Sequence, residues 1–190
     1  MTNITPQIYV ASLSDYNAGR LYGIWIDATQ DCSDILEQIE KMLEGSTEEV
    51  AEDWAIHDTE GFCGYDVSEH HNLEELSAVA NGIDEYGAAF AAYTDCLKEL
   101  ISEHNDFIEK LNSEYFEEAY CHHWESEKDF ALKSDVVEEI YSYNKLPSWW
   151  QDHIDWDSVA NTLFQDEYQA VKANNYDYAS YGIYVFKFDV

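Results

Sequence analysis

Basic residues are scarce in this sequence. Among its 190 residues, 9 are Lys or Arg, with Arg20 as the sole arginine, against 40 Asp and Glu, so the formal net charge at pH 7 is −31. A protein that binds nucleic acid directly needs a cationic face to neutralise phosphates, and anionic membranes attract basic segments in the same way. The shortage of cations therefore excludes nucleic acid as a direct partner and disfavours binding to a membrane surface.

Long apolar runs and sorting signals are absent as well. The longest weakly apolar stretch, Gly87 to Tyr93, is far shorter than the roughly 20 residues that span a bilayer. The N-terminal residues, Met1 to Gln7, contain neither the basic nor the apolar region of a signal peptide. We therefore expect a protein that stays in the cytoplasm.

Cofactor and catalytic motifs are equally missing. The four cysteines, Cys32, Cys63, Cys96 and Cys121, are dispersed and form no CxxC pair, which favours reduced packing residues over disulfides or zinc ligands. No P-loop, GxSxG or GxGxxG motif occurs. The sequence therefore predicts no cofactor, no metal site and no enzymatic activity.

One enzymatic alternative stays open. His57-Asp58 resembles the His-Asp pair of metal phosphohydrolases. A lone pair of this kind occurs by chance, however, and no supporting His or Asp cluster has the required spacing. We therefore interpret the histidines as structural or exposed, and keep a metal-dependent hydrolase built on His57-Asp58 as the alternative. Two further runs contain potential ligands, His70-His71 and Cys121-His122-His123. Adjacent residues on a helix point to different faces, however, and a zinc site needs three or four convergent groups.

Apolar side chains are plentiful despite the charge. Hydrophobic residues make up 46% of the chain and aromatic ones 15%, whereas Gly and Pro number 8 and 2. Acidic disordered chains are poor in apolar and aromatic residues. We therefore expect a folded α+β protein with a highly acidic surface, made of helices and short antiparallel strands.

Apolar periodicity places the expected elements along the chain. The expected strands are 8–10, 21–26, 52–58 and 181–188, the first two being an antiparallel pair joined by a turn over 14–19. The expected helices are 31–45, 84–102, 105–111, 113–124, 128–143 and one that begins after Asp155. Asn72 and Glu75 form a capping signature, and Asn81-Gly82 precedes the 84–102 helix. We group these elements into an N-terminal α/β module (1–66), a helical middle module (67–112) and a C-terminal α/β module (113–190).

The size of the charge needs an explanation, since solubility requires a net charge of only about 2–8 in a small domain. In the predicted helices the carboxylates lie opposite the apolar residues, as Glu37, Glu40 and Glu44 do. A net charge of −31 equals that of about 53 Å of duplex DNA, and carboxylates accept the same bidentate arginine contacts as phosphates. A DNA-like acidic surface is therefore one hypothesis, and adaptation of an ordinary soluble domain to high salt is another.

The carboxylates expected on a DNA-like surface lie in the middle and the last third of the chain. A single acidic helix face needs no role beyond solvation. The joint presence of so many beside 9 basic residues favours a common electrostatic role. The candidates are Glu99, Glu103, Asp106, Glu109, Glu114, Glu117, Glu118, Glu125, Asp129, Glu138 and Glu139.

Three segments carry a family resemblance. The run from Ile8 to Asp27, IYVASLSDYNAGRLYGIWID, closely resembles the opening of the ArdA-type antirestriction proteins. The run from Glu52 to Phe62 is similar to that family's second signature. Leu146-Pro147 with Ile154-Asp155-Trp156, followed by Ala160, Leu163 and Asp166, resembles the C-terminal one. The three segments occur in the family's order and span most of the chain.

The resemblance implies a DNA mimic encoded on mobile genetic elements. Such proteins occupy the DNA-binding cleft of type I restriction-modification enzymes and block restriction and modification. It also implies an elongated, curved chain of three small modules that forms a homodimer through the C-terminal module, where Trp149 and Trp150 are candidate interface residues.

The motif residues themselves are expected to form the scaffold rather than the contacts. We expect Gly19 to serve a turn, and Trp25 and Ile56 to lie in the core. The other motif positions interpreted in this way are Tyr9, Asn17, His57 and Asp58.

Overall fold

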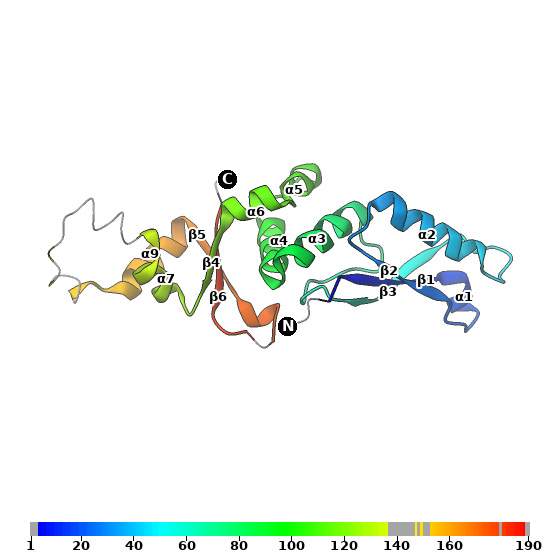
Figure 1. The fold of residues 1–190 in the computed structure, drawn as a ribbon, viewed down its shortest axis with the longest axis horizontal. Helices are drawn as coiled ribbons and strands as arrows, with labels where there is room; N and C mark the ends of the chain where they lie inside the picture. The colour runs from blue at the N-terminus through cyan, green and yellow to red at the C-terminus, as the bar shows by residue number, and fades with distance from the viewer. Residues whose placement is uncertain (1–3, 137–146, 148, 150–152, 179, 189–190) are drawn as a thin grey trace. The chain divides into compact units, whose positions relative to one another are not determined.

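Two small antiparallel sheets, each packed against helices, organise the chain (Figure 1). The structure is a computed structural model that describes residues 4–136, 147, 149, 153–178 and 180–188. The chain divides into two units, Met1–Phe116 and Glu117–Val190. The expected mixed α+β fold with antiparallel strands is confirmed, whereas the three-module division and the elongated arrangement stay predictions.

The first sheet has the order β2-β1-β3. Its strands are β1 (Gln7–Ser12), β2 (Gly23–Asp27) and β3 (Trp54–Glu60), and β1 pairs antiparallel with both neighbours. The predicted antiparallel pair is therefore confirmed. The predicted turn over 14–19 is wrong in its first part, because the short helix α1 (Leu13–Asn17) begins there. The Ser12 side chain caps α1 by accepting a hydrogen bond from the Asp15 amide.

Helix α2 (Cys32–Glu44) covers one face of this sheet (Figure 1). Ile35, Ile39 and Met42 recur at helical spacing and are all buried. Burying a side chain of this size stabilises a fold by about 1.5–3 kcal/mol. The predicted helix over 31–45 is confirmed, and it ends at Gly45.

Helices α3 (Leu73–Tyr86) and α4 (Ala88–Leu100) follow. Asn72 caps α3 by accepting hydrogen bonds from the amides of the first turn, as its capping signature predicts. The predicted start of a helix at residue 84 is wrong, because α3 continues through Gly82. A Cβ at Gly82 would lie 2.2 Å from the Phe90 ring, so this glycine permits close helix packing rather than a break. The boundary lies at Gly87, whose φ is +65°.

An aromatic cluster closes the first unit. Phe90, Tyr93 and Phe116 are buried, and their ring centroids lie 5.3–5.5 Å apart. The Tyr86 ring contacts Phe116 at 4.5 Å. Helix α5 (His104–Lys110) agrees with the predicted helix over 105–111.

The second sheet has the order β4-β6-β5. Its strands are β4 (Tyr120–Trp124), β5 (Tyr168–Lys172) and β6 (Ile183–Lys187). The predicted helix over 113–124 is wrong in its second half, because helix α6 (Ser113–Ala119) ends there and β4 pairs with β6. The closing strand is confirmed, and β5 was not foreseen.

Helices α7 (Glu127–Lys133) and α9 (Trp156–Asp166) pack in the second unit. Phe130 of α7 joins Tyr168 and Val185 of the sheet in one core cluster. Asp155 caps α9 as predicted, by accepting a hydrogen bond from the Ser158 amide. Residues 137–143 of the predicted helix over 128–143 lie outside the described residues.

The four cysteines are all free thiols. Cys96 is buried, and burial together with the nearby Glu99 carboxylate raises the pKa of its thiol to about 12. This environment agrees with a reduced packing residue. In the described residues, no helix combines the length and the apolar composition that crossing a bilayer requires.

Candidate acidic binding surface

Two of the described carboxylates are buried, Asp15 and Glu75. Asp15 forms an ion pair with Arg20 and accepts a hydrogen bond from Ser46 Oγ at 2.7 Å. The Arg20 backbone amide also donates to the Asp15 carbonyl at 2.9 Å. Gly19, with φ of +82°, makes the turn that brings Arg20 back, as the sequence predicts. The sole arginine is therefore used to hold the loop after β1.

Glu75 of α3 is the centre of a second internal network. Its carboxylate accepts hydrogen bonds from Tyr65 Oη at 2.9 Å and from His71 Nε2 at 3.1 Å, and it forms an ion pair with Lys98 at 2.9 Å. Burial by itself would raise the pKa of Glu75, but the donors His71, Lys98 and Tyr65 outweigh it and lower the pKa to about 2. The network ties the loop before α3 to α4.

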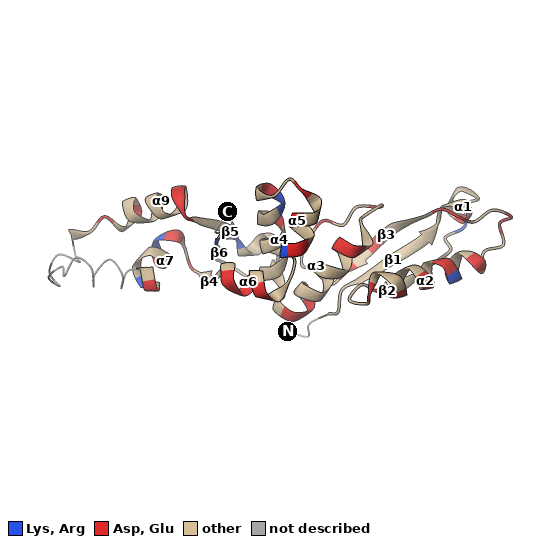
Figure 2. Ribbon diagram, turned by 90° about the horizontal axis from the view of Figure 1, so that it is seen from above, with Lys and Arg blue, Asp and Glu red and all other residues tan. Residues whose placement is uncertain are grey.

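Two ion pairs at the surface involve further basic residues. Lys128 lies 2.7 Å from Asp157, and Lys187 lies 3.3 Å from Glu167. Because these cations and the two internal ones already have acidic partners, few are left to neutralise other carboxylates. Figure 2 accordingly shows many Asp and Glu (red) and few Lys and Arg (blue) along the ribbon of the described residues.

Helix α2 carries an ordered row of carboxylates. Asp34, Glu37, Glu40 and Glu44 are exposed and lie three or four residues apart. Such steps advance by about 4.5–6 Å along a helix axis, whereas phosphates on one DNA strand advance by about 3.4 Å. The row is therefore an ordered line of negative charge whose axial spacing is about 1.3 to 1.8 times that of the phosphates on one DNA strand.

The structure places most of the predicted carboxylates at the surface. Those up to Glu114 belong to the first unit, and those from Glu117 onward belong to the second. Asp129 is half-buried and forms an ion pair with Lys133, so part of its charge is compensated. Glu138 and Glu139 lie outside the described residues. The exposed members are Glu99, Glu103, Asp106, Glu109, Glu114, Glu117, Glu118 and Glu125.

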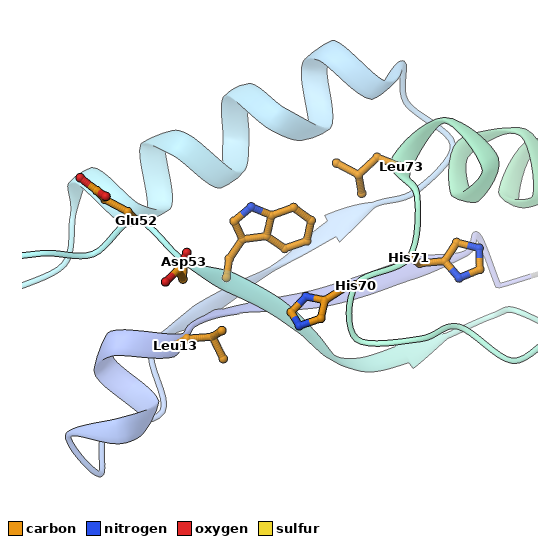
Figure 3. A pocket seen from close by; sticks show the side chains of 7 residues that line it. Leu13, Glu52, Asp53, His70, His71 and Leu73 are labelled. Atoms are coloured by element: carbon orange, nitrogen blue, oxygen red, sulfur yellow. The ribbon is translucent and has the colours of Figure 1, made fainter.

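The first unit also has two acidic hollows that no sequence motif predicts. One, of about 570 Å³, is lined by glutamates of α2 and of the loop before β3, namely Glu40, Glu44, Glu48, Glu49 and Glu52. The other, of about 500 Å³, has Glu52 and Asp53 at one end and His70 and His71 at the other (Figure 3). The sequence signal for both hollows is a cluster of acidic residues, Glu48-Glu49 and Glu52-Asp53, that follows the carboxylates of α2 closely in the sequence.

The hydrolase alternative receives no support from the described residues. The His57 ring lies edge-on against Tyr16 at 4.9 Å, and Asp58 Oδ1 accepts a hydrogen bond from the Thr59 amide at 2.8 Å. Within this part of the chain, no group of three or more His, Cys, Asp or Glu converges as metal ligands do. His57 and Asp58 therefore have local partners of their own.

Two motif residues differ in burial. Ile56 is buried, as predicted, but Trp25 is 46% exposed, so its assignment to the core is wrong. Trp25 pairs directly with Tyr9, on the sheet face opposite the buried Ile8 and Ile26. Strand alternation therefore directs it away from α2.

The candidate dimer residues are only partly described. Trp149 is 62% exposed, and Trp150 lies outside the described residues. An exposed tryptophan is compatible with an interface. The homodimer itself stays a prediction.

Comparison with known proteins identifies a family. The family model described as antirestriction protein (ArdA) matches residues 8–178. No curated protein matches the chain. The family match includes all three segments of sequence resemblance and covers most of the chain. This protein therefore belongs to the ArdA family of antirestriction proteins.

Proposed function

We propose that this antirestriction protein is a DNA mimic. It occupies the DNA-binding cleft of a type I restriction-modification enzyme and thereby blocks both restriction and modification. It acts as an inhibitor without catalysis of its own, in the cytoplasm of a cell that has received a mobile element, and as a homodimer.

The observation that carries this proposal is that basic residues are paired with buried carboxylates, whereas many other carboxylates are exposed. Arg20 and Lys98 serve the buried carboxylates Asp15 and Glu75, whereas the carboxylates of α2, α5 and α6 are directed outward. A protein that needed charge only for solubility would intersperse lysines among them. The retained charge favours a partner rich in lysine and arginine.

The physical mechanism is competition for cations. The enzyme's cleft binds phosphates through lysine and arginine side chains, and carboxylates accept the same charge-assisted hydrogen bonds. Opposite fields steer the two proteins together and raise the association rate. Because exposed charges are screened by salt, inhibition weakens as ionic strength rises.

Competition with duplex DNA for the methyltransferase core of a type I enzyme tests the proposal. The protein displaces DNA at low salt and loses affinity steeply as salt increases. Neutralising Glu37, Glu40 and Glu44 together by Gln weakens displacement, and so does neutralising Glu114, Glu117 and Glu118. The matched Glu→Asp variants at the same positions keep the charge and retain most of the inhibition.

Two results would contradict the proposal. One is inhibition that is independent of salt, and the other is full inhibition after both sets of carboxylates are neutralised. A halophilic protein would instead unfold in dilute buffer and fail to displace DNA. Unfolding curves of the wild type in dilute buffer and at high salt separate that alternative.

A further inference from the structure

The first sheet has one face that α2 does not cover. In β1, Ile8 and Val10 are buried, and so is their neighbour Ile26 of β2. The residues between them point the opposite way because strand side chains alternate. Tyr9 is paired with Trp25 on one side and with Asp58 on the other. Directly paired residues of antiparallel strands share a face.

The next row of the same face follows from the register. Gln7 is paired with Asp27 and with Glu60. The Asp27 carboxylate accepts hydrogen bonds from the Thr29 amide and hydroxyl, so it is occupied locally. We call the surface formed by Gln7, Tyr9, Trp25, Asp58 and Glu60 the open sheet face.

Aromatic rings occupy the centre of this surface. The ring centroids of Tyr9 and Trp25 lie 5.5 Å apart, and 46% of Trp25 is exposed. Elsewhere in the first unit, Tyr16 of α1 packs edge-on against His57 of β3 and is 56% exposed. Contiguous exposed apolar surface rimmed by polar residues marks interaction sites, and aromatic residues are enriched at the cores of interfaces.

The charge around these rings has a single sign. Asp58 and Glu60 are exposed, and β1, β2 and β3 contain no lysine or arginine. Arg20, which lies over the Tyr22 ring, is already paired with Asp15. A partner that fits must therefore supply cations that also tolerate contact with an aromatic face.

We propose that the open sheet face binds arginine side chains of a basic protein surface. The guanidinium plane stacks on Trp25 or Tyr9, while its N–H groups donate to Asp58 and Glu60. Arginine is favoured over lysine because its guanidinium group is planar, is weakly hydrated and offers several donors in a fixed geometry.

The identity of the partner rests on the proposed function, under which the arginines belong to the DNA-binding cleft of the restriction-modification enzyme. Arginine planes stack on unstacked bases when proteins bind nucleic acids. On this surface the indole and phenol rings stand in for bases, and the carboxylates stand in for phosphates. Trp25 thus becomes a contact residue rather than the scaffold residue that its motif position suggested.

A peptide titration tests the chemistry without the enzyme. The full-length, ¹⁵N-labelled protein is titrated with tetra-arginine and with tetra-lysine, and amide and indole resonances are followed by NMR. Tetra-arginine shifts the Trp25 indole N–H and the Tyr9 and Asp58 amides more than tetra-lysine does. Absence of a Trp25 shift, or equal shifts with the two peptides, overturns the proposal.

Displacement of DNA from the methyltransferase core then tests the partner. Trp25→Ala lowers the affinity by about tenfold, a loss typical of truncating an aromatic contact at an interface. Trp25→Phe keeps a ring and retains most of the affinity. Trp25→Leu keeps apolar volume without a ring, and we expect it to lose as much affinity as Trp25→Ala. The leucine variant therefore keeps the test valid if Trp25→Ala lowers the stability of the fold. Tyr178→Ala, at a residue 96% exposed in the second unit, is the matched control and leaves the affinity unchanged.

The outcomes separate the two proposals. If the wild type displaces DNA and Trp25→Leu does so equally well, the docking surface is wrong and the DNA mimic stands. If the wild type fails to displace DNA while tetra-arginine shifts Trp25, the proposed function is wrong and the arginine-binding surface stands.

Discussion

Arg20 is bound to the buried carboxylate of Asp15, so the only arginine of this highly acidic chain compensates an internal charge. The pair closes the loop between β1 and β2, which lies in the first segment of family resemblance. Ser46 and Thr47 extend the contact to the segment after α2. The most specific part of the sequence is therefore a folding element around a buried ion pair.

Removal of the arginine leaves Asp15 uncompensated. We expect Arg20→Gln to lower the free energy of unfolding by about 2–3 kcal/mol, below the range for fully buried pairs because Arg20 is partly exposed. Urea unfolding measures the change. Lys128→Gln, which breaks the exposed pair with Asp157, is the control and costs less than about 1 kcal/mol. Equal effects of the two substitutions would contradict the structural role of Arg20.

Glu75 makes stability depend on pH in the acid range. Its pKa is lowered to about 2 in the fold, from about 4.3 for an unperturbed glutamate. The stabilisation is thus fully present above about pH 4.3 and is lost as the pH falls through 2. Glu75→Gln is expected to cost about 3 kcal/mol at pH 7 and progressively less toward pH 2.

Urea unfolding of the wild type and of Glu75→Gln at pH 7, 4 and 2.5 measures this difference. Glu74→Gln, at the exposed neighbouring position, is the control and shows little change at any pH. If the difference in free energy of unfolding between the wild type and Glu75→Gln stays constant over this pH range, the ionised carboxylate is not the cause of the stabilisation.

Gly82 is expected to tolerate no side chain, because a Cβ there would overlap the Phe90 ring. Gly82→Ala should lower the free energy of unfolding by about 1–3 kcal/mol, although alanine favours helix. In a Phe90→Leu background the cost of the same substitution shrinks, since the overlapping ring is gone. Thermal unfolding of the double-mutant cycle checks this coupling, and additive effects would rule it out.

The predicted homodimer has its own test. Sedimentation of the wild type over a range of concentrations should give a dimer, and simultaneous Trp149→Ala and Trp150→Ala should give a folded monomer with the circular-dichroism spectrum of the wild type. Tyr181→Ala, at another exposed aromatic residue of the second unit, serves as the control. A double variant that remains dimeric removes the two tryptophans from the interface.

Local patterns predicted several elements correctly. The apolar spacing of α2, the caps Asn72 and Asp155, and the antiparallel pairing of β1 and β2 all depend on residues close in the sequence. Errors arose where distant contacts outweigh local preference. The local pattern at Gly82 predicts a helix boundary because the packing of this glycine against Phe90 cannot be seen locally. The pattern over β4 predicts helix because the strand partner of β4 lies some sixty residues away.

For the candidate binding surface too, some features follow from the sequence and others depend on contacts between distant segments. The abundance of carboxylates and the family resemblance are properties of the sequence, and the exposure of most predicted carboxylates follows from the cost of burying charge. The acidic hollows and the open sheet face depend on segments brought together by folding.

The sequence by itself determined the net charge of −31, the presence of an apolar core and membership of an antirestriction family. Tertiary structure alone decided how individual charges are used. It buried Asp15 and Glu75 beside the scarce cations Arg20 and Lys98, and it turned Trp25 outward. The physical reason is that charge and apolar content are sums over residues, whereas burial and pairing depend on which residues meet in space.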